Sequence, residues 1–366
     1  MTAGTANAPG RGDGPEISSV CAVPRSANDR IVMGHGSGGR LTHDLVATVF
    51  VPAFDDAALR AGDDGAVLDA AGSAPDARWV LSTDAHVVNP LFFPGGDIGR
   101  LAVCGTVNDV AMMGAVPLWL TAGFVLEEGL PIDTLRRVVA SMRAAAAESG
   151  VRIVAGDTKV VQRGRADGLY VCTTGFGSLA RGVNVGGARA ASGDVVLLSG
   201  PVGDHGIAVL SGRGDLGFEA DVRSDVAPVH RLAAAAIAAG GSGVHVLRDP
   251  TRGGLATTLH EIAVQSNAGI VVTEERIPVR AEVRAACELL GLDPMHVACE
   301  GRMVAVVAAE AAETVLRAVR AVAGGEGAVT IGEVRAAPPR RVLMATPLGS
   351  HRILDALAGE ILPRIC

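Results

Sequence analysis

The chain has 366 residues, of which 49% are hydrophobic and 19% are charged, so it has ample material for a buried core and is not a generally disordered protein. Its 32 Lys and Arg residues against 39 Asp and Glu residues give a net charge of -7. With no basic run, this balance argues against duplex nucleic acid as the main partner. The six cysteines contain no C-x-x-C pair, which argues against a zinc or disulfide framework.

Residues 1–28 are small, polar and rich in Gly and Ala, which predicts a disordered extension. The extension lacks the apolar core of a signal peptide, so we expect a cytoplasmic protein. The stretch most like a membrane span is Val110–Leu126, but it contains Gly114, Pro117 and Gly123. A helix end followed by a buried strand explains it better than a membrane-spanning helix.

The first half of the chain mixes strands with a helix. The helix is predicted over Ile98–Met113, with Asp97 as its N-cap and Gly114 as its stop. The predicted strands are β-branched or apolar runs: Arg78–Thr83, Arg152–Ala155 and Leu169–Phe176.

A loop-like, Gly- and Arg-rich stretch, Ser178–Gly193, divides the chain. Strands and helices then mix again, as Asp194–Ser199, Arg231–Ala239, Val244–Leu247, Leu255–Val264, Ile270–Thr273, Met303–Ala308, Ala311–Ala323 and Val329–Val334. This pattern predicts a mixed α and β fold (α+β or α/β) in two domains, 29–186 and 187–345. Residues 346–366 are predicted to be a flexible tail that carries the terminal Cys366.

Two glycine-rich runs are candidate phosphate loops. Gly34–Gly39 matches G-x-G-x-x-G, but the apolar run before it, Ile31–Met33, is only three residues long, so a dinucleotide site is a weak interpretation. Gly95-Gly96-Asp97 leads directly into a predicted helix, where free backbone N–H groups can hold phosphate oxygens. An ordinary capped helix start explains this second run equally well.

Acidic residues gather at the predicted ends of elements. Asp64, Asp84 and Asp109 (with Asn108 beside it) occur in this way, as do Asp157 and its neighbours in Gly156-Asp157-Thr158. Each alone is typical of a cap or a turn. Four such groups beside two glycine loops favour a Mg²⁺–nucleotide site, because Mg²⁺ binds carboxylates together with substrate phosphates.

Three further residues are candidates for chemistry. Lys159 is the only lysine, against 31 arginines, which indicates a role that an arginine performs poorly, such as proton transfer. Cys366 ends the chain; it is either an incidental thiol or a carrier of a thiol-bound group. Glu300 is an acid or base candidate or a turn residue, and the loop Asp249–Gly254 is typical of an anion site at a helix start.

These motifs together resemble the carbamoyl dehydratases of nickel–iron hydrogenase maturation, within the aminoimidazole ribonucleotide synthetase-like (PurM-like) ATP-binding superfamily. The resemblance covers nearly all of Ile31–Cys366. The segments that carry it are Met33–Gly39, Asp63–Ala66, Ser82–Asp84, Phe92–Gly99, Val107–Gly114, Gly156–Lys159, Asp249–Gly254, Glu300-Gly301 and Pro363–Cys366. One departure is Ala298-Cys299 before Glu300, where Asn or Ser is expected next to the glutamate.

The resemblance implies an N-terminal ATP-binding domain with a dimerising β-sheet, a C-terminal α/β sandwich domain and a mobile tail. It implies that a partner carbamoyltransferase, HypF, loads Cys366, that ATP then dehydrates the S-carboxamide to a thiocyanate, and that cyanide passes to iron on a HypC–HypD scaffold. In this interpretation Asp64, Asp84 and Asp109 bind Mg²⁺, Glu300 orients or deprotonates the amide nitrogen, and Lys159 stabilises charge on the carbonyl oxygen. The residues predicted to bind ATP are Asp64, Asp84, Gly95, Gly96, Asp97, Asn108, Asp109, Gly156, Asp157 and Thr158.

Two alternatives stay open at this point. A PurM-like kinase or synthetase that acts on a free small molecule would not need Cys366. A non-catalytic assembly scaffold would use the tail only to dock a partner, and it would leave the clustered acids and Lys159 without a role.

Overall fold

The computed structural model describes residues 1, 31, 33–36, 39–54, 56–69, 78–214, 221–357, 362 and 364–365. Residues 33–366 form one compact unit. The predicted extension (beyond Met1) and Cys366 lie outside the described residues. Within the described part of the chain, no helix combines the length and the apolar character needed to cross a membrane.

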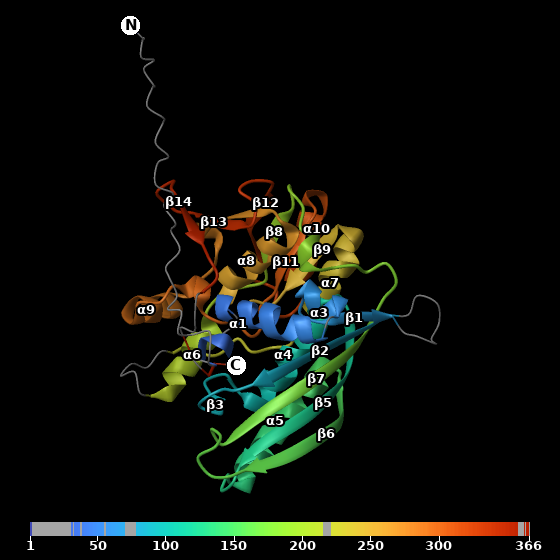
Figure 1. The fold of residues 1–366 in the computed structure, drawn as a ribbon, viewed down its shortest axis with the longest axis vertical. Coiled ribbons are helices and arrows are strands. Elements are labelled where there is room, and N and C mark those ends of the chain that lie inside the picture. Colours follow the sequence, from blue (N-terminus) through green and yellow to red (C-terminus); the bar gives the residue numbers. More distant parts are fainter. Residues whose placement is uncertain are drawn as a thin grey trace. The chain divides into compact units, whose positions relative to one another are not determined.

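The N-terminal part begins with short helical segments and continues as a sheet with two long helices (Figure 1). Its helical elements are the 3-10 turn Met33–Gly36, α1 (Arg40–Leu45), a π-helical turn (Val46–Phe50), α2 (Val51–Phe54), α3 (Ala57–Ala61), α4 (Ile98–Met112) and α5 (Ile132–Ser149). Its strands are β1 (Ala66–Asp69), β2 (Arg78–His86), β3 (Phe92–Phe93), β4 (Gly96–Asp97), β5 (Val116–Glu127), β6 (Arg152–Val161) and β7 (Leu169–Leu179).

The first sheet has five strands in the order β1-β2-β7-β5-β6. Its pairs are antiparallel except β5 and β6, which are parallel. One face packs on α4 and α5 through a core cluster that includes Leu101, Val138, Leu120 and Val171. Side chains alternate across a strand, so Leu81 of β2 points to the other face of the sheet, where it is 37% exposed.

The C-terminal part is built on a seven-stranded sheet in the order β14-β13-β10-β12-β8-β11-β9. Its strands are β8 (Val195–Leu198), β9 (Val244–Arg248), β10 (Gly269–Thr273), β11 (Val304–Val307), β12 (Val329–Arg335), β13 (Arg341–Ala345) and β14 (His351–Leu354). Its α-helices are α6 (Asp204–Arg213), α7 (His230–Gly240), α8 (Gly254–Ser266), α9 (Ala281–Leu290) and α10 (Ala309–Arg320).

Neighbouring residues of β8 face opposite sides of this sheet. Val196 packs in a cluster with α8, whereas Leu197 packs with α7 and α10. The second sheet therefore lies between α8 on one face and α7 with α10 on the other (Figure 1). The prediction of a mixed α and β fold is confirmed, with a five-stranded sheet in the first half of the chain and a seven-stranded sheet in the second; the predicted domain bounds stay a prediction.

The helix after Asp97 forms for the predicted reason. Asp97 Oδ1 accepts hydrogen bonds from Gly99 N (2.8 Å) and Arg100 N (3.1 Å) at the start of α4. At the other end, Gly114 has a positive φ of 78°, a backbone conformation that glycine adopts without strain.

One strand prediction was wrong in its end point. The strand expected to stop at Gly156 continues as β6 to Val161, so Asp157 and Lys159 lie within a strand. Glycine usually weakens a strand, but here a Cβ on residue 156 would meet Ala122 O at 2.4 Å. The glycine is needed for close pairing with β5 and does not end the strand.

Two other predictions changed in detail. The apolar run expected before the first glycine loop is not a strand at its last residue, since Met33 begins a 3-10 turn. The segment expected to be a tail begins later than predicted, because β14 pairs with β13 from Ala345↔His351 to Val342↔Leu354.

Candidate active site

Carboxylates from both parts of the chain lie within electrostatic reach of one another. Asp64 precedes β1, Asp84 lies on β2 and Asp109 on α4. Asp249 follows β9, and Glu300 lies in the loop before β11. The charge of Asp64 raises the pKa of Asp109 and of Asp249. The charge of Asp249 in turn raises the pKa of Asp109 and of Glu300. The structure thus brings the three predicted metal-binding carboxylates together with two more from the second half; we call these five the acidic cluster.

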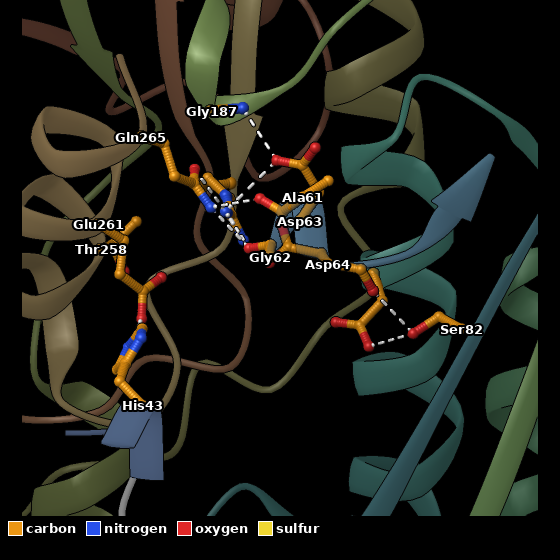
Figure 2. Close-up of polar contacts among 12 residues, drawn as sticks. His43, Ala61, Gly62, Asp63, Asp64, Ser82, Gly187, Thr258, Glu261 and Gln265 are labelled. Atoms are coloured by element: carbon orange, nitrogen blue, oxygen red, sulfur yellow. Dashed lines mark hydrogen bonds and ion pairs between the residues drawn. The ribbon is translucent and has the colours of Figure 1, made fainter. Parts of the chain in front are cut away.

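Asp64 is held by a buried arginine from the other domain. Arg248 Nη1 bonds Asp64 Oδ1, and its Nη2 donates to Gly62 O at 2.9 Å and to Gln265 Oε1 at 3.0 Å. Asp63 anchors the same loop, since its Oδ1 accepts from Gly187 N at 2.9 Å (Figure 2). Burial nevertheless raises the pKa of Asp64 to about 6, against the attraction of Arg248.

Asp109 shares a serine hydroxyl with the Asp64 backbone. Ser82 Oγ lies 2.7 Å from Asp109 Oδ2 and 2.8 Å from Asp64 O; Ser82 and Asp64 are labelled in Figure 2. A hydroxyl carries one proton, so both contacts are hydrogen bonds when Asp109 is protonated and donates to Ser82. Burial, followed by the charge of Asp249, raises the pKa of Asp109 well above its ordinary value, in agreement with this arrangement.

Asp249 and Glu300 complete the cluster. Asp249 is 8% exposed and Glu300 is 3% exposed. For both, burial is the main cause that raises the pKa. Asp64 Oδ2, Asp249 Oδ2 and Glu300 Oε1 are buried without a hydrogen-bond partner.

Unpartnered buried carboxylate oxygens fit a hard cation. Across the described residues, no three His, Cys, Asp or Glu side chains are grouped closely enough to hold a metal ion by themselves. This combination suits Mg²⁺, which is usually bound through one or two carboxylates, water and substrate phosphates.

An arginine and a glycine loop at a helix start lie beside the acids. Arg252 Nη2 is 4.0 Å from Asp84 Oδ1. The loop that carries it ends in Gly253 and Gly254, both with positive φ, and leads into the 13-residue helix α8. This loop was predicted as an anion site. Thr257, which lies in the first turn of α8 after it, has its Oγ1 buried without a hydrogen-bond partner. The arrangement suits a phosphate that approaches the acidic cluster together with a cation.

Lys159 occupies a separate pocket of about 320 Å³ on the first sheet. Its Nζ lies 2.6 Å from Asp157 Oδ2, and both side chains are 71% exposed. Thr158 N donates to Asp157 Oδ1 at 2.8 Å. His86 also lines the pocket, and its Nε2 is 3.6 Å from Asp84 Oδ2. Through His86 the pocket and the acidic cluster share a wall.

The second glycine loop makes its contacts within the protein. Asp97 is the N-cap of α4, and its Oδ2 also accepts from Ser141 Oγ at 2.6 Å. Gly95 and Gly96 pack against residues 223–226, where a Cβ on residue 95 would lie 2.7 Å from Ser224 N. Nucleotide contacts for these three residues stay a prediction.

Asn108 clamps two segments together. It is 1% exposed, its Nδ2 donates to Ala227 O at 3.1 Å, and its Oδ1 accepts from Val229 N at 2.8 Å. The same amide nitrogen lies 3.4 Å from Glu300 O. Asn108 therefore positions the loop of Glu300, and direct contact with ATP stays a prediction.

The chain end returns to this region. Cys366 lies outside the described residues, but the preceding Ile365 is only 4% exposed. It packs in the cluster that contains Phe93 and Ala298, and its carbonyl oxygen lies 2.8 Å from His205 Nε2. The end of the chain thus packs in the same cluster as Ala298, which precedes Glu300 by two residues.

Sequence reasoning missed two contributors to this site. His86 follows Asp84 by two residues on one strand, a spacing that signals a shared face. Arg248 ends β9, and only the loop that follows it, Asp249–Gly254, was singled out. Arg248 gave no signal, because its partner Asp64 is 184 residues away.

Two family profiles match the chain. AIR synthase related protein, N-terminal domain, matches residues 62–179, and AIR synthase related protein, C-terminal domain, matches residues 191–343. The chain is 52% identical over 340 residues to carbamoyl dehydratase HypE of Rhizobium leguminosarum bv. viciae, covering 93% of this chain and 96% of that protein. It is 44% identical over 339 residues to carbamoyl dehydratase HypE of Escherichia coli (strain K12), covering 92% and 100%.

Solved structures agree with these sequence relatives. A chain of a HypE–HypF complex superposes with a TM-score of 0.80 at 46% identity, covering 86% of this chain and 99% of that one. HypE in complex with ATP gives a TM-score of 0.76 at 49% identity, covering 92% and 100%. A thiamine monophosphate kinase from Aquifex aeolicus, at 18% identity and a TM-score of 0.58, shares the fold alone.

Proposed function

The chain belongs to the family of carbamoyl dehydratases named HypE, which act in hydrogenase maturation, and on that premise we propose a specific reaction for it. It uses ATP to dehydrate an S-carboxamide on its own Cys366 to a thiocyanate. The cyanide then passes to the iron centre of a nickel–iron hydrogenase under assembly.

The reaction balances as follows. The carboxamide oxygen of Cys366–S–C(=O)–NH₂ attacks the γ-phosphorus of ATP, and ADP leaves. The nitrogen then loses its two protons, the C–O bond breaks, phosphate departs with that oxygen, and a C≡N bond remains on sulfur. The products are the thiocyanate, ADP and phosphate, so the carboxamide has lost one water in total.

Each step is assigned to residues of this chain. Asp64, Asp84 and Asp109 are proposed to hold Mg²⁺ through one or two direct carboxylate contacts, with water and the nucleotide phosphates as its other ligands. The ion would supply neutralising charge at the transferred phosphoryl group. Glu300, buried with a raised pKa, is suited to take a proton from the amide nitrogen. Lys159 is proposed to reach the developing charge on the carboxamide oxygen.

One observation carries this proposal: the seating of the chain end beside Glu300. Ile365 is buried in the same cluster as Ala298. Helix α6 contacts both residues: Gly206 N donates to Ala298 O at 3.1 Å, and His205 Nε2 lies 2.8 Å from Ile365 O. A kinase of a free metabolite has no use for a buried chain end at its acidic cluster. A carrier arm that presents its own terminal thiol requires one.

Intact mass spectrometry of the C-terminal peptide tests the reaction. The protein is incubated with a carbamoyltransferase and its substrates, with and without Mg-ATP, beside Cys366→Ala. We expect a carbamoyl adduct on Cys366 that loses the mass of one water only with Mg-ATP. ATP consumption without any adduct would refute the proposal and favour a small-molecule synthetase or kinase, and an adduct that never loses water would favour a scaffold.

We further propose that the chain forms a homodimer through the open face and edge of the first sheet. β6 is an edge strand of that sheet, and it exposes Val154 (55%) and Val160 (68%). Trp79, Phe176 and Trp119 form an aromatic cluster on the first sheet, with ring centroids 5.0 Å and 5.8 Å apart in the two pairs. Such an apolar edge is a template for pairing with a second copy.

The other partners follow from the reaction. We propose that HypF loads Cys366, as a HypE relative crystallised with HypF suggests, and that a HypC–HypD complex accepts the cyanide. We also propose that the protein works in the cytoplasm, where thiols stay reduced. The four cysteines described by the structure are free, which supports this location.

A further inference from the structure

A short segment, residues 221–229, contacts both the seated chain end and the loop of Glu300. We call this segment the strap. Ser224 N donates to Pro94 O at 2.8 Å, and Val226 O accepts from Arg100 Nε at 2.9 Å. The Asn108 side chain bonds Ala227 O and Val229 N. The strap is thus fixed along its length to the N-terminal domain.

The strap reaches the chain end through a histidine. Ser224 Oγ lies 2.8 Å from His205 Nδ1, and His205 Nε2 lies 2.8 Å from Ile365 O. A carbonyl only accepts, so Nε2 carries the proton and, in a neutral ring, Nδ1 accepts from the Ser224 hydroxyl. Val226 N donates to the same hydroxyl oxygen at 3.1 Å, which leaves the Ser224 proton free for Nδ1.

The surroundings of His205 favour that neutral form. The ring is 0% exposed, and Phe93 packs edge-on against it at 5.4 Å. Burial lowers the pKa of His205, more than the opposing effects of Asp225 and the Ile365 carbonyl raise it. One tautomer therefore satisfies every polar atom of the ring.

The next residue of the strap holds the Glu300 loop. Asp225 Oδ1 accepts from Glu300 N at 3.0 Å, and Asp225 Oδ2 is 3.2 Å from Arg302 Nε. Gly301 permits this approach, because a Cβ there would lie 1.8 Å from Asp225 O. Neighbouring residues of one rigid segment thus contact the chain end and the proposed base.

We propose that His205 and Ser224 are positioning residues that seat the C-terminal tail and, through Asp225 beside them, couple the seated tail to the placement of Glu300. The idea rests on the proposed function for its purpose, since a carrier arm must be recognised when it arrives. The structural claim itself does not depend on that function. When the tail is seated, His205 contacts both the tail and the strap; when the tail is released, the strap and the Glu300 loop that it contacts become more mobile.

Other contacts of the chain end supply a control variant. Arg213 Nη2 donates to Arg364 O at 3.0 Å, and Asn89 N donates to the same oxygen at 3.1 Å. The Arg364 side chain meets Asp167 Oδ1 at 3.0 Å, and both side chains are partly exposed. Exposed ion pairs contribute little to stability, so Asp167→Asn should not release the chain end. It is the matched control, because it removes a contact of the chain end other than the one with His205.

The first measurement needs neither ATP nor a carboxamide. The rate of Cys366 alkylation by a small maleimide is compared in the wild type, His205→Phe, His205→Gln and Asp167→Asn. His205→Phe keeps an aromatic ring at this position and removes the hydrogen bonds to Ser224 and Ile365. We therefore expect Cys366 to be alkylated about tenfold faster than in the wild type. His205→Gln keeps a donor near the Nε2 position and should restore most of the protection, while Asp167→Asn should stay within about twofold of the wild type.

The second measurement tests the coupling by hydrogen exchange of the peptide that contains the Glu300 amide. We expect faster exchange in His205→Phe and also in a chain truncated after residue 361, which keeps His205 and lacks the last five residues, Ile365 among them. The truncated chain decides the matter if His205→Phe does not fold.

An unchanged alkylation rate in folded His205→Phe would overturn the seat. Faster alkylation with unchanged exchange at Glu300, in both His205→Phe and the truncated chain, would overturn the coupling. Failure of the wild type to lose water in the mass assay would refute the proposed function, and both measurements here would still decide this inference.

Discussion

The raised pKa of Asp64 predicts how the stability of the protein depends on pH. The carboxyl is 16% exposed, and burial raises its pKa from 3.8 to about 6. The native state therefore keeps this proton to a higher pH than the unfolded chain does. As the pH rises from about 4 to about 6, the unfolded chain releases the proton first and stability falls; above about 6 the loss is complete.

The size of the effect on stability follows from the difference between the folded-state and unfolded-state pKa values of Asp64. A difference of about 2 in pKa corresponds to about 3 kcal/mol in total, of which about 1 kcal/mol falls between about pH 5 and about pH 7. Removal of the carboxyl in Asp64→Asn also weakens its contact with Arg248, which shifts stability at every pH. The difference in pH dependence between the two proteins is insensitive to that constant shift.

The assay is denaturant unfolding at about pH 5 and about pH 7, in the wild type and in Asp64→Asn. We expect the wild type to lose about 1 kcal/mol more than the variant between the two pH values. Asp63→Asn is the matched control, because it removes the neighbouring carboxylate on Arg248 and leaves Asp64 in place. Equal pH dependence in wild type and Asp64→Asn would refute the buried, proton-retaining carboxyl.

Mg²⁺ supplies the second half of this test. A cation held by the ionised acidic cluster stabilises the charged form, so Mg²⁺ with a non-hydrolysable ATP analogue should remove most of the extra loss in the wild type. If Mg²⁺ stabilises the wild type and Asp64→Asn equally at about pH 7, Asp64 does not hold the ion.

Three further predictions test single residues. Lys159→Ala should slow dehydration of loaded Cys366 by about 100-fold or more in single-turnover assays, with an unchanged melting temperature because its ion pair is exposed; an unchanged rate would remove Lys159 from the mechanism. Asp97→Ala should lower the free energy of unfolding by about 1 kcal/mol through loss of the α4 cap, and weaker ATP binding in calorimetry would show that Asp97 has a second role. Val160→Glu should give a monomer in light scattering whereas Val139→Glu, an exposed site on α5, should not; a dimer in both would place the interface elsewhere.

Local sequence signals predicted the local parts of the fold. The cap at Asp97 and the stop at Gly114 fixed α4 to within one residue. The error at β6 came from the same kind of signal, because Gly156 reads as a break when its strand partner is unknown. The helix α5, with its C-terminal Gly150 at a φ of 72°, was not predicted although its glycine offered a stop signal.

The residues of the candidate site also divide into those with a local sequence signal and those placed by long-range packing. Asp64, Asp84 and Asp109 were grouped from the sequence because oxygen ligands recur at element ends. The fold places Asp84 and Asp64 within electrostatic reach of Asp109, and the role of the three as metal ligands stays a prediction. Asp249 was noticed only as the start of an anion loop, and Arg248 was not noticed at all. Both enter the site through the packing of one domain on the other, which no local pattern encodes.

That packing explains why the acidic cluster is tolerated. The second domain brings Asp249 and Glu300 against carboxylates of the first, with Arg248 as the buried cation between them. Without a ligand the domains therefore meet across an excess of carboxyl groups, whose raised pKa values favour their protonated forms. In the proposed mechanism, a nucleotide that binds with Mg²⁺ would replace those protons with a divalent charge. The same ligand that enables phosphoryl transfer should thus tighten the contact between the domains. The strap and the seated chain end lie along that contact, so ATP binding should slow exchange at the Glu300 amide even before the carboxamide is present.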